Sequence, residues 1–427
     1  VAVNGGRLVL NTSETIGSLA STGSGGEVEL NANTLTIGGD GDVTPNENTI
    51  FAGAINGTGN LIKTGDDTQT FTGNKTYGGT TTISEGTLRA GNGGTTGNFG
   101  AGNVAVAAGA TAELNRSDNI TIANLFTGAG TLTQSGTGTT TLTGVNGGAN
   151  QFTGTGNINA GAVLVNGTFG DTVGNTAVIN VNTGGTLQGT GTIAGNVNVN
   201  TGGTLAAGAS PGVLTVAGDL DLDGASVSAF ELGAPNNPTS ALNDRVDVGG
   251  VLTLDGTLNV TSATLADGYY RLFTHGSLVN SGLTVGTLPL GASAATVLTN
   301  VGGEVNLRVG NTPGTQFWDG SVTNASNGSA DGGNGTWSAS EANWTISNGT
   351  FNDAWGSNDA EFGGAAGTVT VSGTQLVNDI DFVTSGYVLN GGTLSLTGGP
   401  SEISVVAAGT ATINSVLSGT GGLDKTG

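Results

Sequence analysis

Two pairs of carboxylates have a spacing that glycoside chemistry could use. Asp359 and Glu361, and likewise Asp379 and Asp381, are each separated by one residue, so each pair would share one face of a β-strand. One carboxyl group could then act as the acid and the other as the base or nucleophile of a glycosidase. Acidic pairs on solvated strand faces are far commoner than catalytic pairs, so a β-helix glycosidase is an alternative and no catalytic residue is predicted.

The residues needed for nucleophilic catalysis or for a polysaccharide lyase are sparse in this sequence. The single histidine, His275, stands in LFTHGSL at the end of an expected strand, where a surface position is typical. A Ser-His-Asp arrangement needs a histidine beside its nucleophile, and the chain has no cysteine that could replace the serine. A polysaccharide lyase needs clustered cations, but the nine lysines and arginines are scattered from Arg7 to Lys425. The chain is therefore not expected to be an enzyme.

Calcium binding is a second chemistry that the acidic residues could support. The segment Gly38–Val43, GGDGDV, resembles half of a repeat-type calcium turn, but no tandem copy follows to complete it. Asp219, Asp221 and Asp223 alternate along one expected strand and could recruit a hard cation. A solvated acidic edge explains the same spacing, so no metal ligand and no cofactor are predicted.

Rows of threonine raise a third alternative. Thr139, Thr141 and Thr143 share one face of TTTLTG, and Thr80 and Thr82 share a face in an earlier segment. Ice-binding solenoids carry such rows on many successive turns. Here the rows are interrupted by Asn, Ser and Glu, so an ice-binding solenoid is a minor alternative.

All four tryptophans lie between Thr315 and Ala360, in a chain with only 5% aromatic residues. Buried indole rings would thicken the core locally or close a corner of it, and we expect such a thickening or insertion near 314–362. The alternative is an exposed platform on which a carbohydrate stacks. The four residues are Trp318, Trp337, Trp344 and Trp355.

The composition indicates a thin and extended core. Glycine accounts for 82 of the 427 residues. The hydrophobic content of 35% is too high for a disordered linker and too low for a thick core. A solenoid that buries a few side chains in each turn satisfies both limits. The net charge of −22 disfavours nucleic-acid binding, and no stretch approaches the ~20 apolar residues of a membrane-spanning helix.

Short alternating strands and turn-forming corners recur along the chain. The segment Ile50–Gly91 gives the pattern, and GTGNLIKTG (57–65) returns as GAGTLTQSG (128–136) and GTGGLDKTG (419–427). Repeats of this length indicate stacked structural units. The last copy stops at Gly427 within its unit, so the natural chain is expected to continue.

The corners could instead be hairpin turns. Asp255-Gly256 stands between two alternating runs and, taken alone, favours an antiparallel hairpin. We favour a corner between two sides of one β-helix turn, because similar turn-forming residues recur between strands over the whole chain and no segment has a helical pattern. The expected fold is an all-β parallel β-helix (β-solenoid) with turns of roughly 20 to 25 residues, each rising ~4.8 Å.

Two stretches of the sequence resemble a known family. GTGNLIKTGDDTQTFTGNKTYGGTTTISEGTLRAG (57–91) resembles the autotransporter-associated β-strand repeat of bacterial autotransporter passenger regions. GTLQGTGTIAGNVNVNTGGTLAAGASPGVLTVAGDLDLDG (185–224) is similar to the passenger segment that commonly follows such repeats. The resemblance implies a right-handed parallel β-helix that is exported through the outer membrane and displayed outside the cell.

The resemblance also implies how the chain is organised and what it does. Function is expected to lie in display and contact without turnover, as a structural and adhesive stalk or filament segment of a large secreted surface protein. Its expected partners are neighbouring repeats, other copies along the solenoid axis, and host or environmental surface glycans or proteins. Anchoring to the outer membrane would use a region outside these residues, or the protein would be released. The expected segments are the end of a preceding unit (1–49), a repeat (50–91), a diverged repeat (92–184), a passenger-type segment (185–310) and the tryptophan-containing opening of a further block (311–427).

Overall fold

A computed structural model describes residues 1–38, 48–147, 151–208, 211–321 and 325–427. The described residues form β-strands joined by turns, and none of them is helical; consequently none belongs to a helix long and apolar enough to cross a membrane. The chain divides into two compact units. The first comprises Val1–Glu231, Asp244–Thr261 and Thr274–Thr287, and the second comprises Leu232–Asn243, Ser262–Phe273 and Leu288–Gly427.

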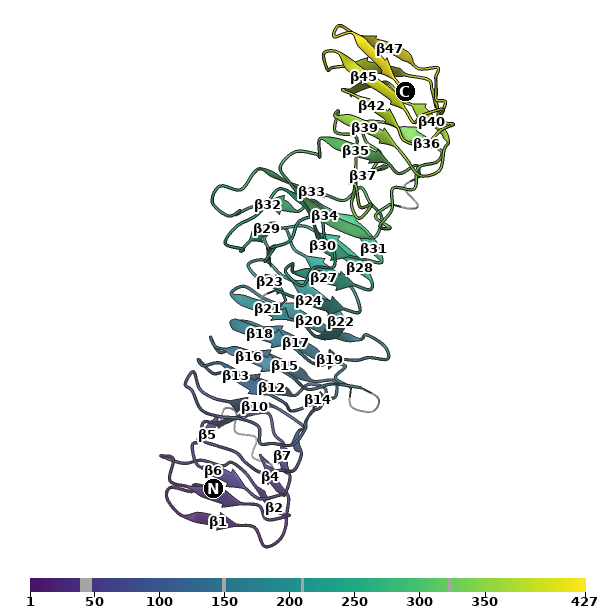
Figure 1. Ribbon diagram of the computed structural model, residues 1–427. Coiled ribbons are helices and arrows are strands. Elements are labelled where there is room, and N and C mark those ends of the chain that lie inside the picture. Colours follow the sequence, from purple (N-terminus) through teal and green to yellow (C-terminus); the bar gives the residue numbers. More distant parts are fainter. Residues whose placement is uncertain (39–47, 148–150, 209–210, 322–324) are drawn as a thin grey trace. The chain divides into compact units, whose positions relative to one another are not determined.

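The first unit is a parallel β-solenoid, in which each strand pairs with the strand that follows it one turn later (Figure 1). One face contains β2 (Glu14–Ile16), β4 (Leu35–Ile37), β7 (Leu61–Lys63), β9 (Thr81–Ile83), β11 (Val104–Val106) and β14 (Phe126–Thr127). The next face contains β5 (Thr49–Phe51), β8 (Thr68–Phe71), β10 (Thr87–Ala90), β12 (Thr111–Leu114), β15 (Thr131–Gln134), β17 (Thr155–Ile158), β20 (Ala177–Val181), β22 (Thr192–Val199), β25 (Leu220–Leu222), β28 (Val251–Leu254) and β31 (Ser277–Asn280).

The remaining strands of this unit complete its turns. A third face contains β13 (Ile120–Ile122), β16 (Thr139–Leu142), β18 (Gly161–Val165), β21 (Gly185–Gly189), β23 (Thr204–Ala207), β26 (Val227–Phe230), β29 (Thr257–Val260) and β32 (Thr284–Val285). Shorter ladders contain β1 (Arg7–Val9), β3 (Glu27–Glu29) and β6 (Ala54–Asn56), and β19 (Thr168–Gly170), β24 (Val213–Val216) and β27 (Arg245–Val248). The strand β22 is long enough to pair in two ladders, with β24 at its start and with β25 at its end.

The parallel pairing confirms the predicted solenoid and decides between hairpin and corner at Asp255-Gly256. The flanking strands β28 and β29 do not pair with each other; β28 pairs in parallel with β25 and β31, and β29 with β26 and β32. The length of a turn varies more than expected. The turn that takes Ala177 to its partner Gly195 is short, whereas the turn that takes Leu220 to its partner Leu252 is much longer.

The core of the first unit is a set of columns of inward side chains. Alternate residues are buried along β15, β16 and β17, as expected for strands with one face turned inward. Burying a Leu, Ile or Val side chain stabilises a fold by roughly 1.5–3 kcal/mol, so each turn adds its own increment. One such column runs through Leu88, Ala112, Leu132, Gly156, Ile179, Val197, Leu220 and Leu252.

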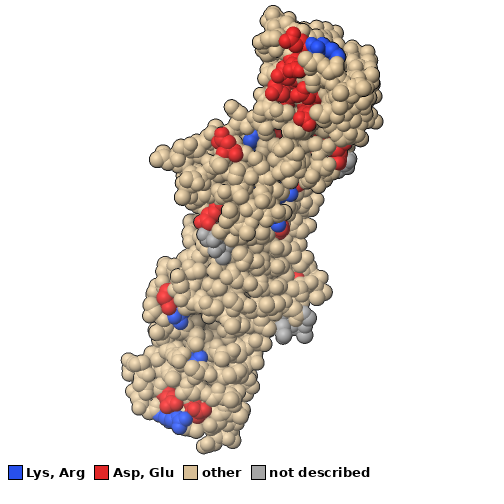
Figure 2. Space-filling model, in the orientation of Figure 1, with Lys and Arg blue, Asp and Glu red and all other residues tan. Residues whose placement is uncertain are grey.

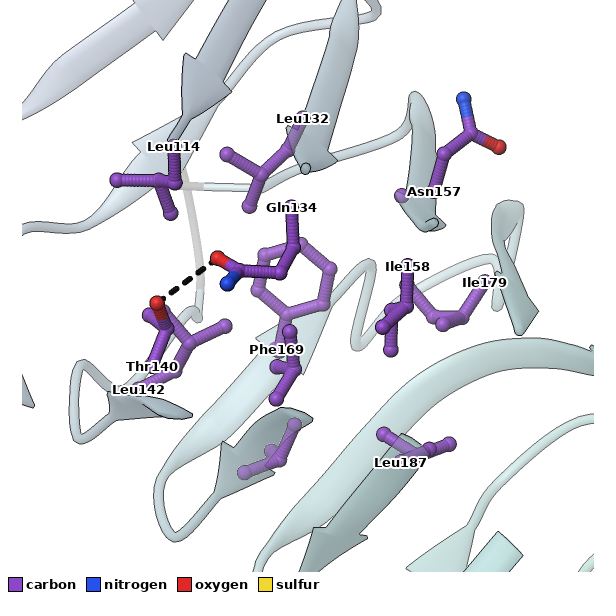
Figure 3. Close-up of a pocket in the computed structure, with 13 residues that line it drawn as sticks. Leu114, Leu132, Gln134, Thr140, Leu142, Asn157, Ile158, Phe169, Ile179 and Leu187 are labelled. Atoms are coloured by element: carbon purple, nitrogen blue, oxygen red, sulfur yellow. Dashed lines mark hydrogen bonds between the residues drawn. The ribbon is translucent and has the colours of Figure 1, made fainter. Parts of the chain in front are cut away.

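This column has a gap at Gly156. Figure 3 shows the apolar cavity that results, with Leu132, Ile158 and Ile179 pointing into it. The cavity has a volume of about 20 Å³, close to what one water molecule requires. Its one polar lining pair is already satisfied, because the Thr140 hydroxyl donates to Gln134 Oε1 at 2.9 Å (Figure 3).

The second unit returns to parallel ladders after an antiparallel start. Its first strands are β30 (Gly268–Thr274), β33 (Ala295–Leu298) and β34 (Glu304–Val309). The faces that follow contain β35 (Thr315–Trp318), β39 (Asp359–Phe362), β42 (Ile380–Phe382), β45 (Ser401–Val405) and β48 (Leu423–Thr426); β36 (Gly335–Trp337), β40 (Thr368–Val371), β43 (Val388–Asn390) and β46 (Thr412–Ile413); and β41 (Thr374–Val377), β44 (Thr393–Leu396) and β47 (Val416–Gly419).

One turn of the second unit carries an excursion. The chain runs from Thr315 to Asp359 before these two residues pair, whereas in the next turn Ala360 already pairs with Ile380. The additional chain includes β37 (Trp344–Thr345) and β38 (Asn352–Asp353), which pair in an antiparallel arrangement. The structure therefore confirms a local thickening near 314–362.

The tryptophans form the core of this thickening. Trp318, Trp337 and Trp344 are fully buried and Trp355 is 7% exposed. The Trp344 ring centroid lies 4.4 Å from that of Trp355 and 4.9 Å from that of Trp337, within the range of favourable aromatic contacts. The packing interpretation is confirmed, and an open platform of indole faces is wrong.

Candidate functional site

The two carboxylate pairs that the sequence singles out lie next to each other. Glu361 on β39 pairs with Asp381 on β42, and the backbone N–H of Ala360 donates to the carbonyl of Asp379. The row continues onto β45 and β48, where Glu402 pairs with Asp424. Figure 2 shows acidic side chains gathered on this part of the second unit. We call Asp359, Glu361, Asp379, Asp381, Glu402 and Asp424 the acidic ladder.

Burial, followed by repulsion from neighbouring carboxylates, raises the pKa of two members of the acidic ladder, Asp359 and Glu361. Burial raises the pKa of Asp359, and the charges of Asp379 and Asp381 raise it further. Burial and then the Asp381 charge raise the pKa of Glu361 in the same way. The charged forms of Asp359 and Glu361 are therefore less favourable than those of freely solvated carboxylates. Within the described ranges, no group of three or more His, Cys, Asp and Glu side chains is arranged to hold a metal ion.

The other acidic candidates serve the corners of the solenoid. Asp219 Oδ1 accepts a hydrogen bond from the backbone N–H of Val251 at 2.7 Å. Asp223 accepts from the backbone of Ala225 and the hydroxyl of Thr201, and these two bonds lower the pKa of its carboxyl group. A cation bound by Asp219, Asp221 and Asp223 would have to compete with these bonds. Of the Gly38–Val43 segment, only its first residue lies within the described residues.

The structure also places His275 and the threonines that the sequence singles out. His275 directly follows β30 and is half-buried, in contrast to the expected surface position. Thr139 and Thr141 are half-buried at alternate positions of β16. Thr141 pairs with Thr121 on β13, but the partners on β18 are Ala162 and Leu164, so the row does not continue onto β18. Thr82 on β9 also has non-threonine neighbours on both sides. A longer row, missed because turn lengths vary, contains Thr68, Thr87, Thr111, Thr131 and Thr155.

A polar hollow in the second unit was also missed by sequence reasoning. It has a volume of about 460 Å³, within the ~300–1,000 Å³ typical of small-ligand sites. The end of β34 supplies Arg308, and two loops on either side of the tryptophan excursion supply the other side chains. The lining residues are Arg308, Asn311, Thr312, Ala354, Trp355, Gly356 and Asn358.

Hydrogen bonds fix the walls of the hollow. Asn358 Nδ2 donates to Thr312 Oγ1 at 3.1 Å and to the Pro313 carbonyl at 2.8 Å, which joins the two loops. A Cβ atom on Gly356 would lie 2.1 Å from Thr312 Oγ1, so the loops approach this closely only because residue 356 is glycine. Trp355 Nε1 donates to the Leu376 carbonyl at 2.7 Å and thereby fixes the indole ring.

Arg308 at the edge of the hollow is neutralised by a buried acid. Its Nη1 donates to Asp353 Oδ2 at 2.5 Å, and Asp353 is 3% exposed. The Tyr269 hydroxyl donates to the same carboxylate at 3.1 Å, and burial, with the Asp353 charge, raises the pKa of this tyrosine. The guanidinium and the carboxylate therefore form a polar pair without net charge at the hollow.

Two lysines are buried inside the first repeat. Lys63 Nζ donates to the carbonyls of Thr64 and Gly65, both at 2.6 Å. Lys75 Nζ donates to the Gly53 carbonyl at 2.8 Å and lies 4.8 Å from the ring centroid of Phe71. Burial lowers the pKa of both lysines, that of Lys75 to about 7.

The second repeat replaces Lys63 by an amide. Gln134, the equivalent residue of that repeat, also points inward, and its Nε2 donates to the carbonyls of Gly136 and Gly138 at 2.9 and 3.2 Å. The strand that carries Lys63, β7, pairs with β4 and β9, whereas the strand that carries Gln134, β15, pairs with β12 and β17 in another sheet. Successive repeats therefore begin on different faces of the solenoid.

These two stretches also match a family model. The Passenger-associated-transport-repeat model matches residues 61–90 and 132–165. The chain carries autotransporter passenger repeats. It is also 42% identical over 339 residues to the Adhesin BmaC autotransporter of Brucella suis biovar 1 (strain 1330).

The homology to this adhesin covers most of the chain but little of the adhesin. The match includes 74% of the chain and 10% of the relative's length. Together with the parallel pairing described above, it identifies the chain as a passenger-type β-solenoid segment that contains two passenger repeats.

Proposed function

We propose that this passenger segment is a structural and adhesive stalk, which acts by display and contact without turnover. It would belong to a larger protein at the bacterial cell surface or outside the cell, attached through another part of that protein or released from it. The observation that carries the proposal is the 42% identity to an autotransporter adhesin over 74% of the chain.

The architecture supports a role in display. Each turn of the first unit pairs its backbone with the preceding and the following turn, so turns can be added without altering those already present. The interior holds columns of inward apolar side chains, and only 9% of the residues in the chain are charged. Neighbouring turns, other copies of the segment and glycans or proteins on a host or environmental surface are the proposed partners.

The arrangement of the carboxylates supports contact over turnover. A glycosidase keeps an acid and a base or nucleophile on two sides of its substrate, whereas Asp359, Glu361, Asp379 and Asp381 follow one another along adjacent strands of a single ladder. The raised pKa values of Asp359 and Glu361 have a sufficient cause in burial and in the charges of the neighbouring carboxylates.

Inhibition of bacterial attachment tests the proposal. The purified chain is added to bacteria that display the full-length protein, and attachment to cultured host cells is counted. The folded chain should compete with the bacteria and reduce attachment in a dose-dependent manner, whereas heat-unfolded chain at equal concentration should not. If the folded chain binds neither host cells nor abiotic surfaces and leaves attachment unchanged, the segment is a spacer and its adhesive role is wrong.

A further inference from the structure

The polar hollow of the second unit offers side-chain groups that the protein itself leaves unused. Asn311 is exposed, and its side-chain amide makes no hydrogen bond within the described part of the chain. Asn358 uses its Nδ2 twice but its Oδ1 accepts nothing from the described residues. The Thr312 hydroxyl accepts from Asn358 and retains its own proton for donation. Three polar side chains with free donors or acceptors therefore converge on one hollow of about 460 Å³.

The charge of the hollow favours an uncharged ligand. Its only ionised lining residue is Arg308, and Asp353 already neutralises it at 2.5 Å. An anionic ligand would have to take the guanidinium from Asp353, which is 3% exposed and would remain as a buried charge without its partner. The acidic ladder begins at Asp359, next to the lining residue Asn358, and repels anions further.

The hollow also has a small apolar wall. Trp355 and Ala354 line it beside the polar groups, and the bond from Trp355 Nε1 to the Leu376 carbonyl fixes the ring. Amides and a hydroxyl next to an indole suit a ligand that carries hydroxyl groups on one side and C–H groups on the other. The bonds between Asn358, Thr312 and Pro313 hold the loops in place before any ligand enters, which lowers the entropic cost of binding.

We propose that this hollow binds a short neutral saccharide, through hydrogen bonds to Asn311, Thr312 and Asn358 and packing against Trp355. The proposal rests on the proposed surface role only for the origin of the ligand, a glycan of the contacted surface. It makes Asn311 the most informative position, because its side chain contributes to the hollow and to no described contact within the protein.

Direct binding measurements with the full chain described here test the proposal. The chain is applied to a panel of neutral oligosaccharides of glucose, galactose, mannose and N-acetylhexosamines, together with sialylated and uronic acid-containing oligosaccharides. The strongest neutral binder is then titrated while tryptophan fluorescence is recorded, since Trp355 lines the hollow. We expect saturable binding to neutral members of the panel and a change in tryptophan emission.

Matched variants assign this binding to the hollow. Asn311→Ala should weaken it about threefold to tenfold, which corresponds to the loss of one hydrogen bond. Asn103→Ala removes another exposed asparagine, in the first unit, and should leave both binding and melting temperature unchanged. The melting temperature of Asn311→Ala should also equal that of the parent chain, which separates a binding defect from a folding defect.

Three outcomes would overturn the inference: no saccharide bound at millimolar concentration, binding confined to the acidic saccharides, or equal affinity of the parent chain and Asn311→Ala. The attachment assay on the same variants separates this inference from the proposed function. Attachment that is inhibited by a chain without saccharide binding leaves the adhesive role intact and refutes the hollow. Saccharide binding by a chain that binds neither host cells nor abiotic surfaces and does not inhibit attachment supports the hollow and refutes the adhesive role.

Discussion

Thr81 and Gly156 occupy the same inward position in the two passenger repeats, but only Thr81 has a side chain that fills it. Thr81 pairs with Leu61 and Gly156 pairs with the equivalent Leu132. The Thr81 hydroxyl donates to the Phe99 carbonyl at 2.7 Å. Gly156 leaves the cavity shown in Figure 3. The second repeat thus keeps the strand pairing of the first at this position with a less complete interior.

Gly156→Ala should stabilise the second repeat. The added Cβ would lie 2.7 Å from Cδ1 of Ile179, the mobile end of that side chain, and the cavity gives Ile179 room to move. Filling apolar space and restricting the unfolded chain should together add about 0.5–1.5 kcal/mol, measured by amide hydrogen exchange of β17 and β20. Gly185→Ala is the control: its Cβ would lie 2.2 Å from the Ile158 carbonyl oxygen and should destabilise. A lower stability of Gly156→Ala would show that the site cannot adjust.

Lys75 should make the first repeat less stable in acid. Burial lowers its pKa in the folded protein to about 7, below the ~10.4 of an unfolded chain. Between these two pH values the unfolded state binds more protons, so stability rises with pH; below about 7 the full penalty remains. Lys75→Met should abolish this rise and stabilise the repeat at pH 7 by on the order of 2–4 kcal/mol. The measurement is hydrogen exchange of β8 between pH 6 and 9, and identical pH profiles for both proteins would contradict the expectation.

Lys63 should contribute to stability at neutral pH, in contrast to Lys75, because its ammonium group donates to two carbonyls at 2.6 Å and the charges of nearby acids partly offset its burial. Lys63→Leu removes the bonds to Thr64 and Gly65 and should cost about 1–3 kcal/mol. Lys63→Gln should lose less than ~1 kcal/mol, since Gln134 makes the equivalent bonds in the second repeat. Melting temperatures of the three chains test this order, and equal losses for Leu and Gln would show that the carbonyl bonds contribute nothing.

The acidic ladder should weaken the second unit as the pH rises. The pKa of Glu361 is raised in the folded state by burial and by Asp381, so the folded state binds more protons between the ordinary carboxyl pKa of ~4.3 and the raised value. Stability should fall across that interval. Glu361→Gln should reduce this fall and stabilise at pH 7 by a few tenths of a kcal/mol, a small value because the group is largely solvated. Urea unfolding of both chains at pH 4 and pH 7 measures this fall in stability. About 0.5 M NaCl should reduce the difference in stability between the two pH values. A larger difference in salt would contradict the role of repulsion.

We expect no glycan turnover from Asp359 and Glu361. The chain, incubated with a panel of neutral and acidic polysaccharides, should release no reducing ends above a heat-inactivated control. Turnover that disappears in a chain carrying Asp359→Asn and Glu361→Gln would instead establish the β-helix enzyme. The result is independent of saccharide binding in the hollow, which lies around Asn311.

The sequence predicts the repeated part of the fold well, because period-two alternation and glycine corners are local signals. It also predicts burial of the tryptophans.

Turn length is not encoded locally, as the long turn from Leu220 to Leu252 illustrates, so the alignment of the acidic ladder could not be foreseen. The hollow could not be predicted for the same reason. Thr312 and Asn358 are far apart in the sequence and come into contact only in the folded unit. The inward position of Lys75 contradicts the usual exposure of lysine. The five sequence segments, from 1–49 to 311–427, remain a proposal.

The direction of the backbone hydrogen bonds has a mechanical consequence for the first unit. Bonds between successive turns run along the solenoid axis, so a pull along that axis loads all the interfaces between turns in series and the weakest interface detaches first. Detaching a single turn releases the chain between two paired residues, such as Ala177 and Gly195 or Leu220 and Leu252. At ~3.4 Å per residue this chain extends by about 60–110 Å. Force on the segment should therefore be relieved in discrete steps of contour length, and under the proposed surface role each step would lengthen the stalk without breaking it.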